Sequence, residues 1–171
     1  MTRFRTLLTA SLCCGALLGS WAVAFAQDAT PKTYACQGFD EPLKSGMDIP
    51  KGRVLPLRAK LVLPDGSFGN QKTIKTTPMI SFKFLPESGP EVDKTAGMEV
   101  RDYGKGNHFV WDDEAHWKFD LGTRNLTDNG KYRVTLLSGD EKEYRVDPTC
   151  TMDFNLRGGR EFWEEEFPEI G

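Results

Sequence analysis

Short runs in which apolar and polar residues alternate are the main structural signal in this chain. Alternation with a period of two places every second side chain on one face of a β-strand. The strongest runs are 54–63, 80–85, 117–121, 132–137 and 150–156. Weaker runs occur at 34–39, 98–100, 108–111 and 143–146. No stretch shows helical periodicity, so the sequence predicts an all-β fold in which 143–146 forms a hairpin with 132–137.

The stretch 117–145 gives the most specific fold signal. Trp117, Phe119 and Leu121 lie on one face of a strand, and a polar connection then leads to the next alternating run. That run opens with Asp128-x-Gly130-x-Tyr132, which is the tyrosine-corner pattern of immunoglobulin-like sandwiches. We therefore predict a single Ig-like antiparallel β-sandwich, with the Tyr132 phenol hydrogen-bonded to nearby backbone.

Pro56 lies inside the run 54–63 and cannot donate a ladder hydrogen bond, so this strand begins late, bulges or lies at an edge.

The aromatic residues of the strands have inward parity, which is more typical of a core than of a sugar-stacking platform. They are Phe82, Phe84, Trp111 and Trp117.

The first 26 residues have the pattern of an export signal. Arg3 and Arg5 precede a largely apolar stretch at 7–23, and Ala24-Phe25-Ala26 forms an A-x-A cleavage site. No second long apolar run follows, so we expect no membrane insertion after cleavage. The predicted organisation is a signal peptide at 1–26, a sandwich domain at 27–158 and a tail at 159–171. The predicted location is periplasmic or secreted.

Two cysteines, Cys36 and Cys150, remain after cleavage. In an oxidising compartment an isolated pair of this kind is expected to form a disulfide. The metal or redox alternative has little support, because neither cysteine belongs to a C-x-x-C motif.

Charge argues against nucleic acid as a partner. The chain carries a net charge of −3, and loss of the two leader arginines lowers it to −5. The tail holds five glutamates against Arg160, so it accounts for −4 of this charge. The remaining body is nearly neutral and has no basic stripe that could follow a phosphate backbone.

The acidic tail is also aromatic. Phe162, Trp163 and Phe167 lie among the glutamates, after a glycine pair at 158–159. Aromatic side chains are common anchors at interfaces, so we predict that these three bind another exported or envelope protein. The alternative is that Trp163 folds back onto the chain's own sandwich and covers an apolar patch or an edge strand.

The segment 108–116 is a second candidate site. His108, Asp112, Asp113 and His116, with Glu114 between them, could form a metal site of imidazoles and carboxylates. The favoured interpretation is a charged, solvated loop, in which alanine at both histidines changes neither stability nor metal content. No hydrolase motif is present, so the sequence favours a non-catalytic protein without a cofactor.

Four segments, in order, resemble a bacterial exported Ig-like module, the PxKF-type domain. They are G-F-D-E-P at 38–42, K-G-R-V-L-P-L-R at 51–58, G-K-Y-R-V at 130–134 and M-D-F-N-L-R at 152–157. Ala59 stands where that family has phenylalanine, 108–114 resembles an insertion, and the tail is outside the pattern. The resemblance implies a β-sandwich with a structural or binding role and carries no catalytic residues.

Overall fold

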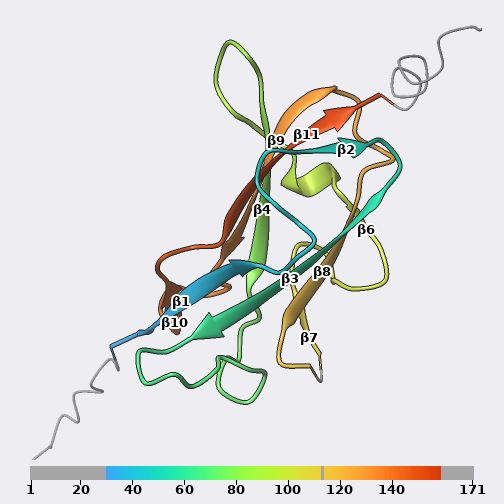
Figure 1. The fold of residues 1–171 in the computed structure, drawn as a ribbon. Coiled ribbons are helices and arrows are strands. Elements are labelled where there is room, and N and C mark those ends of the chain that lie inside the picture. Colours follow the sequence, from blue (N-terminus) through green and yellow to red (C-terminus); the bar gives the residue numbers. More distant parts are fainter. Residues whose placement is uncertain (1–29, 113, 159–171) are drawn as a thin grey trace, which may run out of the picture.

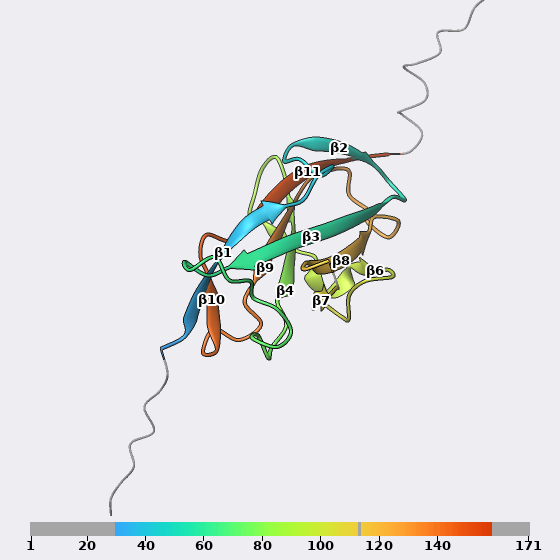
Figure 2. The ribbon, with the colours of Figure 1, turned by 60° about the horizontal axis from the view of Figure 1, so that its bottom comes forward.

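The structure is a computed structural model that describes residues 30–112 and 114–158 (Figure 1). The leader 1–26, Asp113 and the tail 159–171 lie outside the described residues. In the described part, two β-sheets lie face to face (Figures 1 and 2), which confirms the predicted all-β, Ig-like sandwich. No helix among the described residues is long and apolar enough to cross a membrane.

The first sheet has the order β10-β1-β3-β8-β6, with β7 also paired to β8. Its strands are β1 (Lys32–Phe39), β3 (Val54–Val62), β6 (Glu99–Val100), β7 (Val110–Trp111), β8 (Trp117–Gly122) and β10 (Tyr144–Val146). The second sheet has the order β2-β11-β9-β4-β5. Its strands are β2 (Met47–Pro50), β4 (Met79–Leu85), β5 (Val92–Asp93), β9 (Gly130–Leu137) and β11 (Thr151–Arg157).

The core lies between the sheets and follows the sequence parity. Leu57 and Phe119 form a cross-strand pair between β3 and β8, and both are fully buried. Phe82 from β4, Tyr132 from β9 and Phe154 from β11 form a cluster of three stacked rings, with the Phe82 and Phe154 centroids 5.2 and 5.6 Å from that of Tyr132. The strongest alternating runs therefore supply the inward faces of both sheets. Two of the four aromatics predicted as core, Phe84 and Trp111, are only half-buried and pack on its rim.

The disulfide joins the two halves of the chain. Cys36 on β1 and Cys150, just before β11, form a disulfide with their Cα atoms 5.3 Å apart. Both residues are buried. The bond therefore ties a strand of the first sheet to the segment that enters the second.

Two connections differ from the sequence-based prediction. The strand β10 does not form a hairpin with β9; it crosses to the other sheet and pairs in parallel with β1, for example Tyr144 with Lys32. A second parallel pair joins β2 to β11. The sandwich is therefore mainly antiparallel, with one parallel pair in each sheet. Turn residues at 138–140 could not reveal this, because they fit a hairpin and a crossing equally well.

Strand β8 also departs from a simple two-faced strand. Its inward residues are buried as expected, but Lys118 and Asp120 on the outer face are also buried, at 8 and 9% exposure. The segment 101–103 runs beside β8, because the Asp120 N–H donates to the Tyr103 carbonyl and the Asp120 carbonyl accepts from the Arg101 N–H. The Tyr103 ring faces the Lys118 ammonium, with 5.1 Å between the nitrogen and the ring centroid. The segments on both sides of β8 thus bury polar side chains that the alternation marks as outward.

Pro56 lies where strand β3 has one neighbour only. It faces Asp120 of β8, whose N–H and carbonyl both point away from β3. The backbone nitrogen of Pro56 accordingly points to the opposite side. There β1 has already left β3, since their pairing covers only Ala59 to Val62. The missing N–H therefore costs no ladder hydrogen bond. Strand β3 itself lies inside its sheet, and only its Pro56 end is an edge.

Candidate functional site

The tyrosine corner has a structural geometry. The Tyr132 hydroxyl donates to the Asp128 carbonyl at 2.8 Å, and the ring is fully buried. Gly130 adopts φ of +133°, and a Cβ there would lie 3.2 Å from the Phe84 ring. The Asp128 carboxylate points elsewhere and pairs with Lys94 at 2.9 Å. Asp128, Gly130 and Tyr132 therefore hold the entry to β9.

The structure brings together only part of the predicted metal cluster. Oxygen or nitrogen atoms of Asp112, Glu114 and His116 lie within 4.8 Å of one another. His108 is not in this group, because its Nδ1 lies 3.1 Å from the Thr77 hydroxyl on another part of the surface. Asp113 lies outside the described residues. The metal-site hypothesis, which needs both histidines at one point, is therefore wrong about His108.

A lysine already occupies the centre of this cluster. The Lys118 ammonium forms a close ion pair with Asp112, and their side chains are 10 and 9% exposed. The Nε2 of His116 lies 2.8 Å from the Asp40 carboxylate, and the His116 side chain is only 13% exposed. The interpretation as a solvated loop is therefore wrong, since the loop folds over β8 and its side chains are held. A metal ion would have to displace the ammonium.

The pKa shifts agree with a structural ion pair. Burial opposes ionisation of Asp112, but the hydrogen bonds from Lys118 and from the His116 N–H outweigh it, so the Asp112 pKa lies below its ordinary value. The hydrogen bond to Asp112 raises the pKa of Lys118. Asp120 differs, because burial raises the pKa of its carboxyl group. Both members of the pair are held charged, which suits a clamp between the loop and β8.

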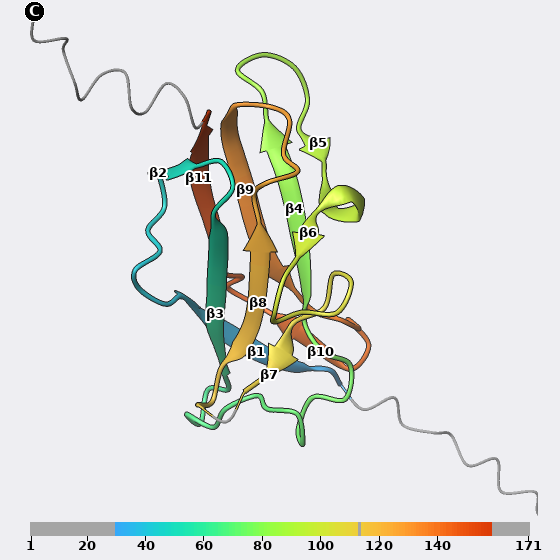
Figure 3. The same cartoon turned by 90° about the vertical axis from the view of Figure 1, so that its right-hand side faces the viewer.

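Three hollows lie on the side of the sandwich where β5, the short helix η1 (Thr95–Gly97), β6 and β7 succeed one another. Figure 3 shows this order of elements. We call the three the corner, upper and lower hollows, and together the side groove. The corner hollow, of about 260 Å³, lies beside Leu126, Asp128 and Tyr132. It shares Asp93 and Ala96 with the upper hollow, and the upper hollow shares Gly106 with the lower one. The three hollows are therefore consecutive.

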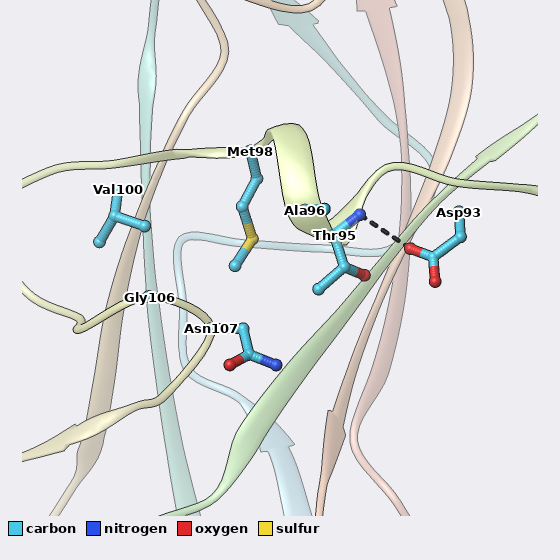
Figure 4. Close-up of a pocket in the computed structure, with 7 residues that line it drawn as sticks. All are labelled: Asp93, Thr95, Ala96, Met98, Val100, Gly106 and Asn107. Carbon is cyan, nitrogen blue, oxygen red and sulfur yellow. Dashed lines mark hydrogen bonds between the residues drawn. The ribbon is translucent and has the colours of Figure 1, made fainter.

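The upper hollow has a volume of about 620 Å³. Figure 4 shows the Met98 side chain hanging from the end of η1 into the space above Asn107, with Val100 to one side. The Thr95 N–H donates to the Asp93 carboxylate at 2.8 Å and fixes the start of η1 (Figure 4). This hollow is therefore a mainly apolar trough with polar ends.

The lower hollow is larger, about 720 Å³, and its floor is aromatic. Phe109 and Trp117 are fully buried beneath it, while Trp111 is half-buried and packs edge-on against Trp117 with centroids 5.2 Å apart. The Trp117 indole is already satisfied, since it donates to the Gly69 carbonyl at 2.7 Å. Among these three rings, Trp111 is therefore the one with exposed surface in the hollow.

The rim of the lower hollow is basic. Its residues include Lys75, Lys105 and His108, with the hydroxyls of Thr76 and Thr77, and none of them is acidic. Among residues 30–112 and 114–158, neither lysine forms an ion pair. The nearby Glu143 carboxylate accepts the backbone N–H groups of Lys75 and Thr76. An apolar floor with a cationic rim suits a ligand that combines aromatic and acidic groups.

Sequence reasoning did not find this groove. Its lower hollow is built from 71–77, 105–111 and Trp117, which are separate in the sequence. Hydrogen bonds from Ile80 to Asn107 and from Phe109 to Pro78 bring the second of these segments to β4. The sequence parity placed Trp111 inward, so it gave no sign of a surface hollow. The proposed partner-binding residues of the tail, Phe162, Trp163 and Phe167, lie outside the described residues.

Comparison with known proteins adds no family. No protein-family model matches the sequence, and a search of curated proteins finds no significant match. Among solved structures, the filamin domain of Lin-41 is 13% identical, with a TM-score of 0.38 over 75% of this chain and 98% of that one. Domains 4 and 5 of the S-layer protein SbsC are 12% identical, with a TM-score of 0.37 over 72% of this chain and 53% of that one. Titin M4 is 11% identical, with a TM-score of 0.31 over 75% of this chain and 99% of that one. The strand order of the chain itself defines the fold.

Proposed function

We propose that this chain is an exported, non-catalytic Ig-like binding module that contacts another exported or envelope protein through its side groove. The observation that carries the proposal is the lower hollow, which combines aromatic side chains with Lys75 and Lys105 and is lined by no acidic residue. The outer face of the second sheet differs, because there Arg133 forms a two-pronged pair with Asp153.

The shape of the groove favours an extended protein segment. Its three hollows follow one another along the side of the sandwich, whereas a small molecule would fill one. Aromatic or aliphatic anchors of the partner would enter the hollows, and its carboxylates would meet Lys75 and Lys105 at the rim. Buried anchors supply most of the affinity of such contacts, and rim charges mainly steer the encounter.

Several features support export and a non-catalytic role. The 1–26 leader pattern and the Cys36–Cys150 disulfide fit a periplasmic or secreted protein. The segments that resemble the PxKF-type domain fit an exported Ig-like accessory module. In the polar cluster around Lys118, the ammonium group and His116 already contact carboxylates, which fits a structural role. We propose no cofactor.

The test begins with affinity capture from the cell envelope, using tagged residues 27–171, and continues with the purified partner. Calorimetry would then compare wild type with the double variant Lys75→Glu and Lys105→Glu. We expect the dissociation constant to rise at least about tenfold, which corresponds to a loss of about 1.4 kcal/mol of binding free energy. Tyr103→Ala is the matched control, because Tyr103 is 44% exposed but does not line the groove. Equal affinity of all three proteins for the partner would refute the groove as its site.

A further inference from the structure

We propose that the acidic, aromatic tail at 160–171 docks in the side groove of its own chain and competes there with the partner. This inference rests on the proposed function, because it names a ligand and a mode of regulation for the same groove. Its basis is the position at which the tail leaves the domain, the length of the tail and the charge of the lower hollow.

The tail begins beside the upper end of the groove. A Cβ on Gly158, the last described residue, would lie 3.2 Å from the Asn129 side chain. The neighbouring residue, Asp128, lines the corner hollow together with Lys94 and Tyr132. A chain that continues past Gly158 therefore starts next to the first of the three hollows.

The tail is long enough to reach the last hollow. Residues 159–171 can span at most about 43 Å when extended. The groove follows β8, whose six residues rise about 17 Å between the Gly122 end, near the corner hollow, and the Trp117 end, under the lower hollow. The tail can thus follow the groove with length to spare for the path between hollows.

The chemistry of the two surfaces is complementary. The tail offers three aromatic side chains and a net charge of −4. The lower hollow offers aromatic side chains, among them the half-buried Trp111, and two lysines that form no ion pair within residues 30–112 and 114–158. Opposite charges at the rim attract the segment, and aromatic burial gives it affinity.

Because the tail is covalently attached to the domain, docking in its own groove is favoured over docking in the groove of a second copy. A short flexible linker gives a tethered segment an effective concentration of about millimolar. Free copies of a protein at micromolar concentration supply far fewer competing tails. A partner therefore has to displace the tail, so tail docking weakens its apparent affinity.

The experiment uses residues 27–171 with a spin label on Glu165→Cys, the native cysteines being held in their disulfide. We expect the label to abolish the amide NMR signals of 75–77 and 105–111, and to spare those of Arg133 and Asp153 on the far sheet. Lys75→Glu with Lys105→Glu should restore the lost signals. The charge-matched control, Lys44→Glu with Lys60→Glu, should not, because neither lysine lines the groove.

A mixture of spin-labelled molecules with isotope-enriched molecules that carry no spin label distinguishes docking in the same chain from docking in a second copy. Signal loss in the isotope-enriched, unlabelled molecules would mean that the tail binds a second copy, which overturns docking in its own chain. Intact groove signals in the labelled molecule would overturn the proposal outright. The two proposals can fail separately. If an external partner binds the groove but the tail does not dock there, only this inference is refuted. If the tail docks but no external partner binds, only the proposed function is refuted.

Discussion

Replacing Tyr132 by phenylalanine tests whether the corner is a structural element. The hydroxyl donates to the Asp128 carbonyl at 2.8 Å, and Tyr132→Phe removes only this oxygen. The ring keeps its contacts, because it stacks with Phe82 and Phe154, whose centroids are 5.2 and 5.6 Å away. No cavity larger than one oxygen atom is created, so the change in stability reports the hydrogen bond.

We expect the substitution to cost about 1–2 kcal/mol of the free energy of unfolding. A buried acceptor left without its donor costs about 1–3 kcal/mol. Asp128 is only partly buried, so water can replace the lost donor in part, and the lower half of that range applies. Alanine at the same position would remove the stacked ring as well and cost about 3–5 kcal/mol.

The pH dependence gives a second, independent readout. Burial and the nearby Asp128 charge raise the pKa of Tyr132 from 10.0 to about 12. The unfolded chain therefore loses this proton at lower pH than the folded chain. The resulting stability is complete below pH 10 and is lost as pH rises through 12, by about 1.4 kcal/mol per pH unit. The phenylalanine variant has no phenol to titrate, so the difference in free energy of unfolding between wild type and variant should shrink above pH 10.

Urea denaturation at pH 7, 10 and 11 would measure both effects. Tyr103→Phe is the control, since Tyr103 is 44% exposed. A variant as stable as wild type at pH 7, with weaker partner binding instead, would refute the structural role of Tyr132. A deficit that stays constant up to pH 11 would refute the argument from burial.

Three further substitution experiments test the disulfide and the loop that packs on β8. Alanine at both Cys36 and Cys150 should lower the free energy of unfolding by about 2–5 kcal/mol, because the disulfide closes a long loop, and denaturation with and without reductant measures this. Lys118→Met should lower the free energy of unfolding in the same assay by leaving Asp112 without its cation, and adding Asp112→Asn should recover most of the loss. His116→Ala should lower the urea midpoint by removing the contact to Asp40, whereas a solvated loop would leave it unchanged.

The residues of the strong strands were predictable because their pattern is local. Alternation alone assigns the inward faces of β3, β8, β9 and β11, since a one-residue shift would expose every apolar side chain. The corner pattern of Asp128, Gly130 and Tyr132 added the Ig-like fold, because only glycine adopts the required positive φ easily. The lone pair Cys36 and Cys150 predicted the disulfide by elimination.

Tertiary structure alone decided the pairing of β10, the burial of β8 and the site. Sequence parity cannot tell which sheet a three-residue strand joins, and β10 pairs with β1. Lys118 reads as an outward residue, but a loop supplies Asp112 and covers it. His108 and His116 are eight positions apart, yet one lies at the groove and the other at Asp40. The lower hollow needs Lys75, Lys105 and Trp111 from separate segments, and only the long-range pairing of those segments brings them together.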